Sequence, residues 1–177
     1  VFPPRKKDIQ KVGIPVASLV RAHAASYHAL HQAAARAGRK VRVGVAHHLR
    51  VFEAARWWNP LDHWMAGVIE ELANGAFLKA LKTGKLRISI PLTLSFSADI
   101  PEAAGTQDFL GLNYYSRDLI AFSFSSPAKM ERRLKSGAEL TDLEWEIFPK
   151  GLGLLLARLH EEFPQLPIHI TENGIAD

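Results

Sequence analysis

Apolar and alanine-rich positions fill residues 16 to 37, with Pro15 just before them and Gly38 just after. Proline suits the first turn of a helix and glycine the position past its end. The pattern therefore predicts a helix over Val16–Ala37. A short β-branched run, Val41–Ala46, follows after a tight loop and is typical of a strand. A helix followed directly by a strand is half of a βαβ unit.

Two more helices are predicted further along the chain. His63–Thr83 has an apolar face, with Asp62 as the expected N-cap and Gly84 as the stop. Gly151–Phe163 carries leucines at helical spacing, and Pro164 ends it. The spacing of these helices leaves room for strands between them.

The remaining apolar segments are short and typical of strands. They are Leu86–Leu92, where Pro91 argues against a central strand, Asp108–Tyr115 with a possible extension over Leu119–Phe124, and Pro167–Glu172. Ser125–Asp142 is polar and glycine-containing, which predicts a mobile surface loop or a short helix. Alternating helices and strands predict an α/β fold with a mostly parallel sheet.

The composition is that of a globular protein. With 177 residues, 47% of them hydrophobic and 23% charged, we expect a single domain over residues 1–177 and exclude disorder. No apolar run approaches the roughly 18 to 20 residues that cross a bilayer, so we expect no membrane partner. The absence of cysteine excludes disulfides, thiol chemistry and cysteine-ligated zinc.

The first residues carry neither an initiator methionine nor the pattern of a secretory signal. We therefore expect the chain to begin inside a longer sequence. A chain without cysteine is compatible with a reducing cytosol without requiring one, and we assign the protein to the cytoplasm.

Charge is distributed unevenly, although the formal net charge is only +4. Residues 1–50 hold ten lysines and arginines against one acid, Asp8, while acids outnumber bases in the rest of the chain. A basic half is compatible with nucleic-acid binding through the stretch Arg5 to Arg50. The basic residues are scattered and no nucleic-acid motif accompanies them, so a solvated surface is the preferred interpretation and no nucleic-acid partner is expected.

Two predicted strands end in polar residues that could carry chemistry. One ends in Asn113-Tyr114-Tyr115 and the other in Thr171-Glu172-Asn173-Gly174. The carboxyl ends of parallel strands are where α/β proteins place their sites. Equally ordinary roles exist, because Glu172 could be a surface acid and the tyrosines could be core aromatics.

Three motifs resemble segments of the family-1 glycoside hydrolases, the retaining β-glucosidases and β-galactosidases. Ile170–Gly174 resembles the family's nucleophile motif, Asp108–Arg117 its sixth-strand segment, and Trp145–Leu152 the element before its next helix. The motifs occur in the family's order and spacing. Weaker similarity covers most of the chain, with a departure at Asn74–Phe77, where many relatives carry Asn-x-Trp-Phe.

The resemblance implies a fold, a reaction and site residues. The fold would be a partial (β/α)8 TIM barrel, about strands 5 to 7 with flanking helices. Glu172 would attack the anomeric carbon, Tyr115 would orient it, Asn113 would bind the sugar, and His48 at the end of strand five would be a further substrate contact or a structural histidine. The substrate would be a β-linked glucoside or related sugar, with no cofactor and no metal.

Retaining hydrolysis also needs a second carboxyl group that acts as acid and base. The family supplies it from an Asn-Glu-Pro motif on strand four, which this sequence lacks. The possible substitutes Glu53, Asp118 and Glu146 do not occupy the family's position, so we expect the chain alone to be inactive. The missing barrel half or a second copy are then its expected protein partners, because open sheet edges favour association.

Histidine and tryptophan clusters offer other chemistry. His23, His28 and His31 lie on the first predicted helix, but no His-Glu-x-x-His pattern supports a metal site. Trp57, Trp58 and Trp64 could stack on sugars, yet their offsets favour packing of the second helix, and Trp145 is likewise assigned to packing. The alternative functions are a non-catalytic carbohydrate-binding remnant that uses Asn113 and Tyr115, and then a nucleic-acid binder.

Overall fold

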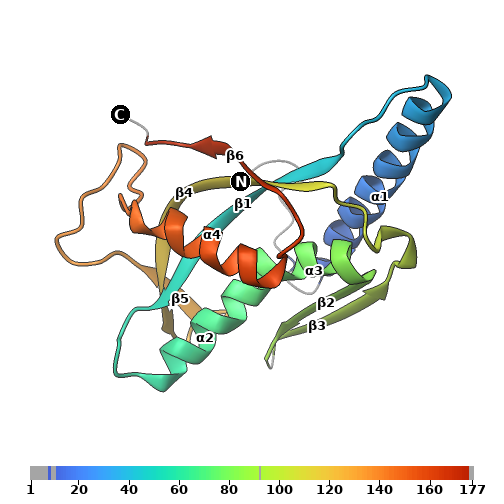
Figure 1. Cartoon of the computed structure of the whole chain (residues 1–177). Helices are drawn as coiled ribbons and strands as arrows, with labels where there is room; N and C mark the ends of the chain where they lie inside the picture. Colours follow the sequence, from blue (N-terminus) through green and yellow to red (C-terminus); the bar gives the residue numbers. More distant parts are fainter. Residues whose placement is uncertain (1–7, 9–10, 92, 176–177) are drawn as a thin grey trace.

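The computed structural model describes residues 8, 11–91 and 93–175 (Figure 1). The helices are α1 (Gly13–Arg36), α2 (Pro60–Glu70), α3 (Ala76–Thr83) and α4 (Lys150–Glu162), with a π-helical turn η2 (Glu71–Gly75) and a 3₁₀ turn η3 (Pro101–Ala103). The strands are β1 (Gly44–Ala54), β2 (Lys85–Ile90), β3 (Leu94–Asp99), β4 (Phe109–Phe122), β5 (Met130–Arg133) and β6 (Ile168–Asn173).

The main sheet is built around β4, which is paired on both sides. β1 runs parallel to it along nearly its whole length. On the other side, β6 pairs in parallel with the first half of β4, and β5 pairs antiparallel with the last residues of β4. Three parallel strands with helices between them confirm the predicted α/β class. β2 and β3 form a separate antiparallel hairpin beside α3 (Figure 1).

Three apolar clusters hold these elements together. The first joins α1, α3 and the β2–β3 hairpin around Val20, Leu81 and Leu86. The second packs α4 on the main sheet, with Leu155 and Leu159 against buried β1 and β4 side chains. The third packs α2 on the far ends of β1 and β4. Each helix therefore buries one apolar face, as the spacing of apolar residues predicted.

The second predicted helix is interrupted and begins earlier than expected. The segment runs as α2, η2 and α3, and Gly84 ends it in the left-handed conformation, at φ 71°, as predicted. The assignment of Asp62 as the N-cap is wrong, because the Asn59 side chain accepts the hydrogen bond from the Leu61 backbone. Asp62 is fully buried and binds Arg56 instead.

The predicted strands overlap β1, β2, β4 and β6, but those for β1 and β4 were too short. β1 extends to Ala54, so His47 and His48 lie within it and not at its end. β4 runs without a break to Phe122. Ser125–Asp142 contains the strand β5 rather than a helix, because β4 offers it a pairing edge. The hairpin partner β3 was missed, and Leu92 lies outside the described residues.

The three histidines of α1 fasten this helix to the segment that precedes β4. Each donates from Nε2: His23 to the Thr106 carbonyl at 2.6 Å, His28 to the Glu102 carbonyl at 2.9 Å, and His31 to the Asp108 carboxylate at 2.8 Å. Their role in the structure is therefore packing and orientation. Within the described part of the chain, no group of three or more histidine, aspartate or glutamate side chains is arranged to hold a metal ion.

A helix that spans a bilayer needs about 20 consecutive, mostly apolar residues. Among the described residues, none of the helices combines the length and the apolar character of a membrane span.

Candidate active site

Glu172 and Tyr115 meet where β6 and β4 run side by side. Their strands are parallel, and a register shift after Leu112 brings Asn113 opposite Glu172. The Tyr115 hydroxyl donates a hydrogen bond to Oε2 of Glu172. This contact, together with partial desolvation, raises the pKa of Tyr115 above its usual range. The carboxylate itself is exposed, so a ligand can reach it.

Asn113 and Asn173 stabilise the backbone around this pair. Thr171 donates its hydroxyl hydrogen to Oδ1 of Asn113, which fixes the Asn113 amide beside Glu172. Asn173 donates from Nδ2 to the Tyr114 carbonyl at 2.8 Å. The second bond ties the end of β6 to β4, which agrees with a role for Asn173 in shaping the turn.

His48 reaches the same place from the third strand. It lies opposite Asn113 in the β1–β4 pairing, and its ring meets the ring of Tyr115 edge-on at 5.4 Å between centroids. Desolvation lowers the pKa of His48, and the neighbouring Arg50 guanidinium lowers it further, while Glu172 and Asp118 act in the opposite direction. The structure therefore brings together all four predicted site residues, Glu172, Tyr115, Asn113 and His48.

Trp145 and Arg50 were missed by sequence reasoning. The Trp145 ring lies 5.7 Å from the Tyr115 ring, and the Arg50 guanidinium sits 4.9 Å above Trp145. These contacts agree with the assignment of Trp145 to packing and also bring its ring to the border of the site. Its place in the Trp-Glu motif was the available signal. Arg50 follows His48 by two residues, and this spacing on a strand could have indicated a common face.

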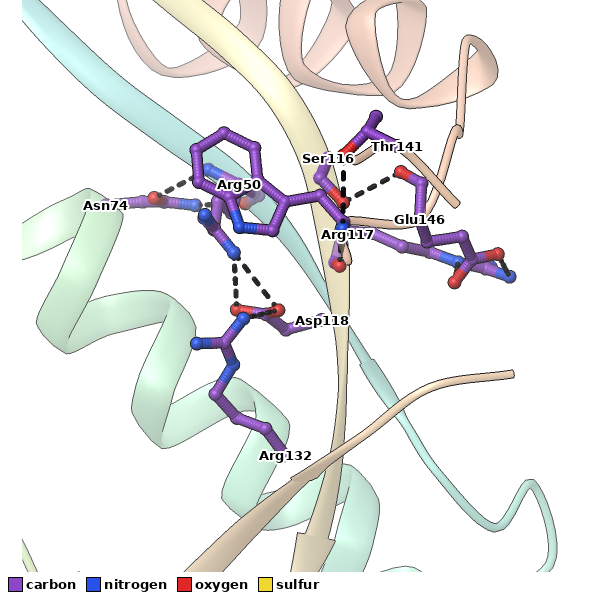
Figure 2. Close-up of polar contacts among 9 residues, drawn as sticks. Arg50, Asn74, Ser116, Arg117, Asp118, Arg132, Thr141 and Glu146 are labelled. Carbon is purple, nitrogen blue, oxygen red and sulfur yellow. Dashed lines mark hydrogen bonds and ion pairs between the residues drawn. The ribbon is translucent and has the colours of Figure 1, made fainter. Parts of the chain in front are cut away.

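The β1–β4 pairing is interrupted beside these residues, and Asn74 bonds to the β1 backbone at this point. The β1–β4 register slips between Leu49 and Val51, which leaves Arg50 without a β4 partner. Asn74, in the π-helical turn, accepts from the Arg50 amide at 3.2 Å and donates to the Arg50 carbonyl at 2.6 Å (Figure 2). The departure noted at Asn74–Phe77 thus leaves intact an asparagine that satisfies the backbone N–H and C=O of Arg50.

Two arginine-carboxylate networks flank the site (Figure 2). Asp118 accepts from Arg50 at 3.2 and 3.3 Å and from Arg132 at 2.5 Å. The Arg117 guanidinium donates two hydrogen bonds to the Glu146 carboxylate, at 3.0 and 2.6 Å, and a third to Glu53 at 2.5 Å. All three carboxylates proposed as substitutes for the acid/base are therefore bonded to arginine side chains within this chain.

Of the three tryptophans near α2, only Trp64 contacts the sheet as predicted, whereas Trp57 and Trp58 are largely exposed. Trp57 is 84% exposed and Trp58 64%, because the turn that carries them projects from the surface. Trp64 is 46% exposed and touches Phe122, with 6.2 Å between ring centroids. None of the three is in ring contact with Tyr115 among the described residues.

Similarity to known proteins identifies the family of this chain. The whole chain, residues 1–177, matches Glycosyl hydrolase family 1. The chain belongs to glycosyl hydrolase family 1. Over 99% of its length it is 29% identical to a 1,4-beta-D-glucan glucohydrolase from Thermotoga neapolitana, of which it covers 42%. Over a shorter stretch, 46% of this chain, it is 39% identical to beta-glucosidase A from Thermotoga maritima and covers 18% of that protein.

Solved structures of family 1 agree with the fold. The family 1 β-glucosidase from Thermotoga maritima matches 100% of this chain with a TM-score of 0.81 at 27% identity, and 40% of that chain is covered. A β-glycosidase from Pyrococcus horikoshii matches 99% with a TM-score of 0.80 at 28% identity, and 38% of it is covered. The chain thus spans about two fifths of these relatives. Its sheet is part of a TIM barrel and is not closed, and the assignment to strands 5 to 7 stays a prediction.

Proposed function

We propose that this chain is the part of a retaining β-glycosidase that carries the nucleophile, Glu172. The observation that supports this most directly is the hydrogen bond from the Tyr115 hydroxyl to Glu172 at adjacent parallel strands. A carboxylate held in this way can attack the anomeric carbon, form a covalent glycosyl-enzyme, and leave again when water attacks. No cofactor or metal takes part in this scheme.

The proposed substrate is a β-linked glucoside or a related sugar. Asn113 and His48 would contact its hydroxyl groups, since both lie level with Glu172 on neighbouring strands. The faces of Tyr115 and Trp145 offer an apolar wall that suits the apolar face of a pyranose. Membership of family 1, whose matched relatives include β-glucosidases, supports this substrate class. A cytoplasmic location stays a prediction.

The second carboxyl group would come from outside these 177 residues. Glu53, Asp118 and Glu146 are each bonded to arginine, so each carboxylate already has a partner within this chain. β1 offers an edge that pairs with no other described strand, and an apolar groove of about 650 Å³ separates it from α1. A parallel strand that precedes α1 would fit there by a right-handed crossover, with its carboxyl end beside His48. The missing barrel half is therefore the proposed partner, and the chain alone is expected to be inactive.

The test is turnover of a chromogenic β-glucoside by the chain alone, by the chain mixed with a co-expressed segment carrying the Asn-Glu-Pro motif, and by the longer protein. We expect turnover only when that segment is present. Glu172→Gln should then lower kcat by about a thousandfold or more, because the nucleophile is lost. Glu161→Gln, a change at an exposed residue of α4, is the matched control and should leave kcat unchanged.

Other outcomes would each contradict part of the proposal. Turnover by the chain alone would mean that an acid among these residues does the acid/base work. Full activity of Glu172→Gln would remove the nucleophile assignment. Sugar-dependent thermal stabilisation of the chain without turnover in the complemented mixture would favour the non-catalytic binding remnant.

A further inference from the structure

A second concave site lies away from Glu172, between the far end of β1 and α2. It is a cleft of about 520 Å³, within the range of ligand sites. Phe52–Ala54 of β1, residues of α2 and Arg158 of α4 line it, and Trp57 stands at its edge. Residues of β1, α2 and α4, together with the turn before α2, form its walls.

The turn that carries Trp57 is rigidly anchored. Asp62, fully buried beneath it, accepts two hydrogen bonds from the Arg56 side chain at 2.7 and 2.6 Å. The same carboxylate accepts from the backbone amides of Arg56 at 3.1 Å and Phe122 at 2.9 Å. His63 Nε2 also donates to the Trp57 carbonyl at 2.8 Å. The exposed indole is therefore presented by a fixed backbone, so a ligand that binds there need not order the turn.

The charged groups that line the cleft, Glu53, Glu70 and Arg158, are all paired. Glu70 is paired with Arg158 inside it, and Glu53 is bonded through Oε2 to Arg117 while its side chain stays 40% exposed. Carboxylates accept and guanidinium groups donate, which suits hydroxyl groups that do both. An ionic ligand would find no unpaired charge here, because both carboxylates and the guanidinium already have partners. An exposed indole beside such groups fits a pyranose ring, which has one apolar face and a rim of hydroxyls.

The cleft is separate from the candidate active site. Its β1 residues lie four to six positions beyond His48, about 13 to 20 Å along the strand. None of His48, Asn113, Tyr115 or Trp145 lines it. The two sites are therefore lined by different side chains, although Glu53 of the cleft is bonded to Arg117, which also holds Glu146 beside Trp145.

We propose that this cleft is a second carbohydrate-binding site, in which the Trp57 indole stacks on one sugar ring and Glu53, Glu70 and Arg158 bind its hydroxyls. The site would hold a neutral β-linked sugar or the end of an oligosaccharide without cleaving it. This inference does not depend on the role of Glu172. It explains why Trp57 is exposed on a turn that a buried carboxylate holds in place.

The experiment follows the four tryptophan indole N–H signals by NMR in the ¹⁵N-labelled chain, assigned by single substitutions, during titration with cellobiose and with methyl β-glucoside. We expect the Trp57 signal to move saturably at millimolar sugar. Trp57→Ala should weaken this binding about tenfold, as followed by calorimetry, because stacking is lost. Trp64→Ala is the matched control, since Trp64 is exposed but does not line the cleft.

The titration is repeated in Glu172→Gln, where the Trp57 shift should persist. Movement of the Trp145 signal alone would overturn the proposal, because sugar would then bind only beside Glu172. A Trp57 signal that neither sugar moves would overturn it as well. Phosphatidylcholine vesicles are titrated in parallel. A Trp57 signal that moves only with the vesicles would also overturn the proposal, because the cleft would then be a lipid-binding surface. Loss of turnover in Glu172→Gln, measured separately, concerns the nucleophile alone.

Discussion

At the scale of residues, the tyrosines are the most informative groups. Tyr115 donates to Glu172, Tyr27 donates to Asp108 at 2.8 Å, and Tyr114 donates to the Phe148 carbonyl at 2.6 Å. Each phenol therefore serves as a donor, and each would lose its bond on ionisation. A tyrosine that must stay protonated to hold a carboxylate acts as a positioning group for that carboxylate.

The three phenols should ionise late in the folded chain. Burial raises the pKa of Tyr114 to about 12, and the pKa values of Tyr27 and Tyr115 are also raised. Unfolded tyrosines ionise near pH 10, so the unfolded state releases these protons first. Stability from these groups is thus fully present below pH 10 and is lost as pH rises toward 12.

Phenolate absorbance, titrated in the native and the urea-unfolded chain, checks this prediction. The native curve should lie to higher pH for all three tyrosines, with Tyr114 last. Tyr115→Phe should remove one of the late steps. A phenol that ionises at pH 10 in the native chain would show that its hydrogen bond is absent.

At the scale of elements, the packing of α4 on β4 depends on a glycine. A Cβ added at Gly151 would meet the Tyr114 hydroxyl oxygen at 1.9 Å, whereas one added at Gly153 would meet nothing within 4 Å. Tyr114 is only 2% exposed and its hydroxyl is fixed by the Phe148 carbonyl, so it cannot easily move. The first turn of α4 therefore approaches β4 closely because residue 151 lacks a side chain.

The two glycines form a matched pair for mutation. Gly151→Ala should destabilise the chain by about 1 to 3 kcal/mol through overpacking. Gly153→Ala should stabilise it by about 0.5 to 1 kcal/mol, because alanine is the better helix former. Urea unfolding followed by circular dichroism measures both changes. Equal effects of the two substitutions would mean that α4 does not pack on Tyr114 as described.

At the scale of the whole molecule, the open sheet is the dominant feature. Among the described strands, β1 and β6 each pair on one side only, with β4. β6 is exposed along most of its length, and Ile170 within it is 51% exposed. Unpaired strand edges with apolar side chains favour association with another chain.

We therefore expect the 177-residue chain to associate with itself in a concentration-dependent manner. Ile170→Lys should shift the population toward monomer, because a charge on the edge strand opposes pairing. Leu143→Lys is the control, since Leu143 is 56% exposed but lies outside both edge strands. Sedimentation velocity over a range of concentrations measures the shift. A single monomeric species at every concentration would contradict the expectation.

The local sequence pattern predicted some helices and strands and missed others. The helices α1 and α4 and the strand β6 were predicted within a few residues, because their apolar spacing and flanking glycine or proline act locally. β3 and β5 were missed, since each forms on a partner strand that a local pattern does not reveal. The N-cap of α2 was assigned to the wrong residue, because Asn59 and Asp62 are both good capping residues. Only the structure shows that Asn59 caps the helix while Asp62 is buried and binds Arg56.

The sequence by itself determined the α/β class, the family and the candidate nucleophile, because these depend on periodicity and on short motifs that stay within one segment. The resemblance assigned Tyr115, Asn113 and His48 to the site of Glu172, and only the tertiary structure shows the contacts through which these and other side chains meet there. Tyr115 lies 57 residues away from it in the chain, and Trp145 and Arg50 reach the site from separate segments. It also decided that Trp57 is exposed beside a cleft. Contacts between distant segments follow from strand register and helix packing, and no local pattern contains that information.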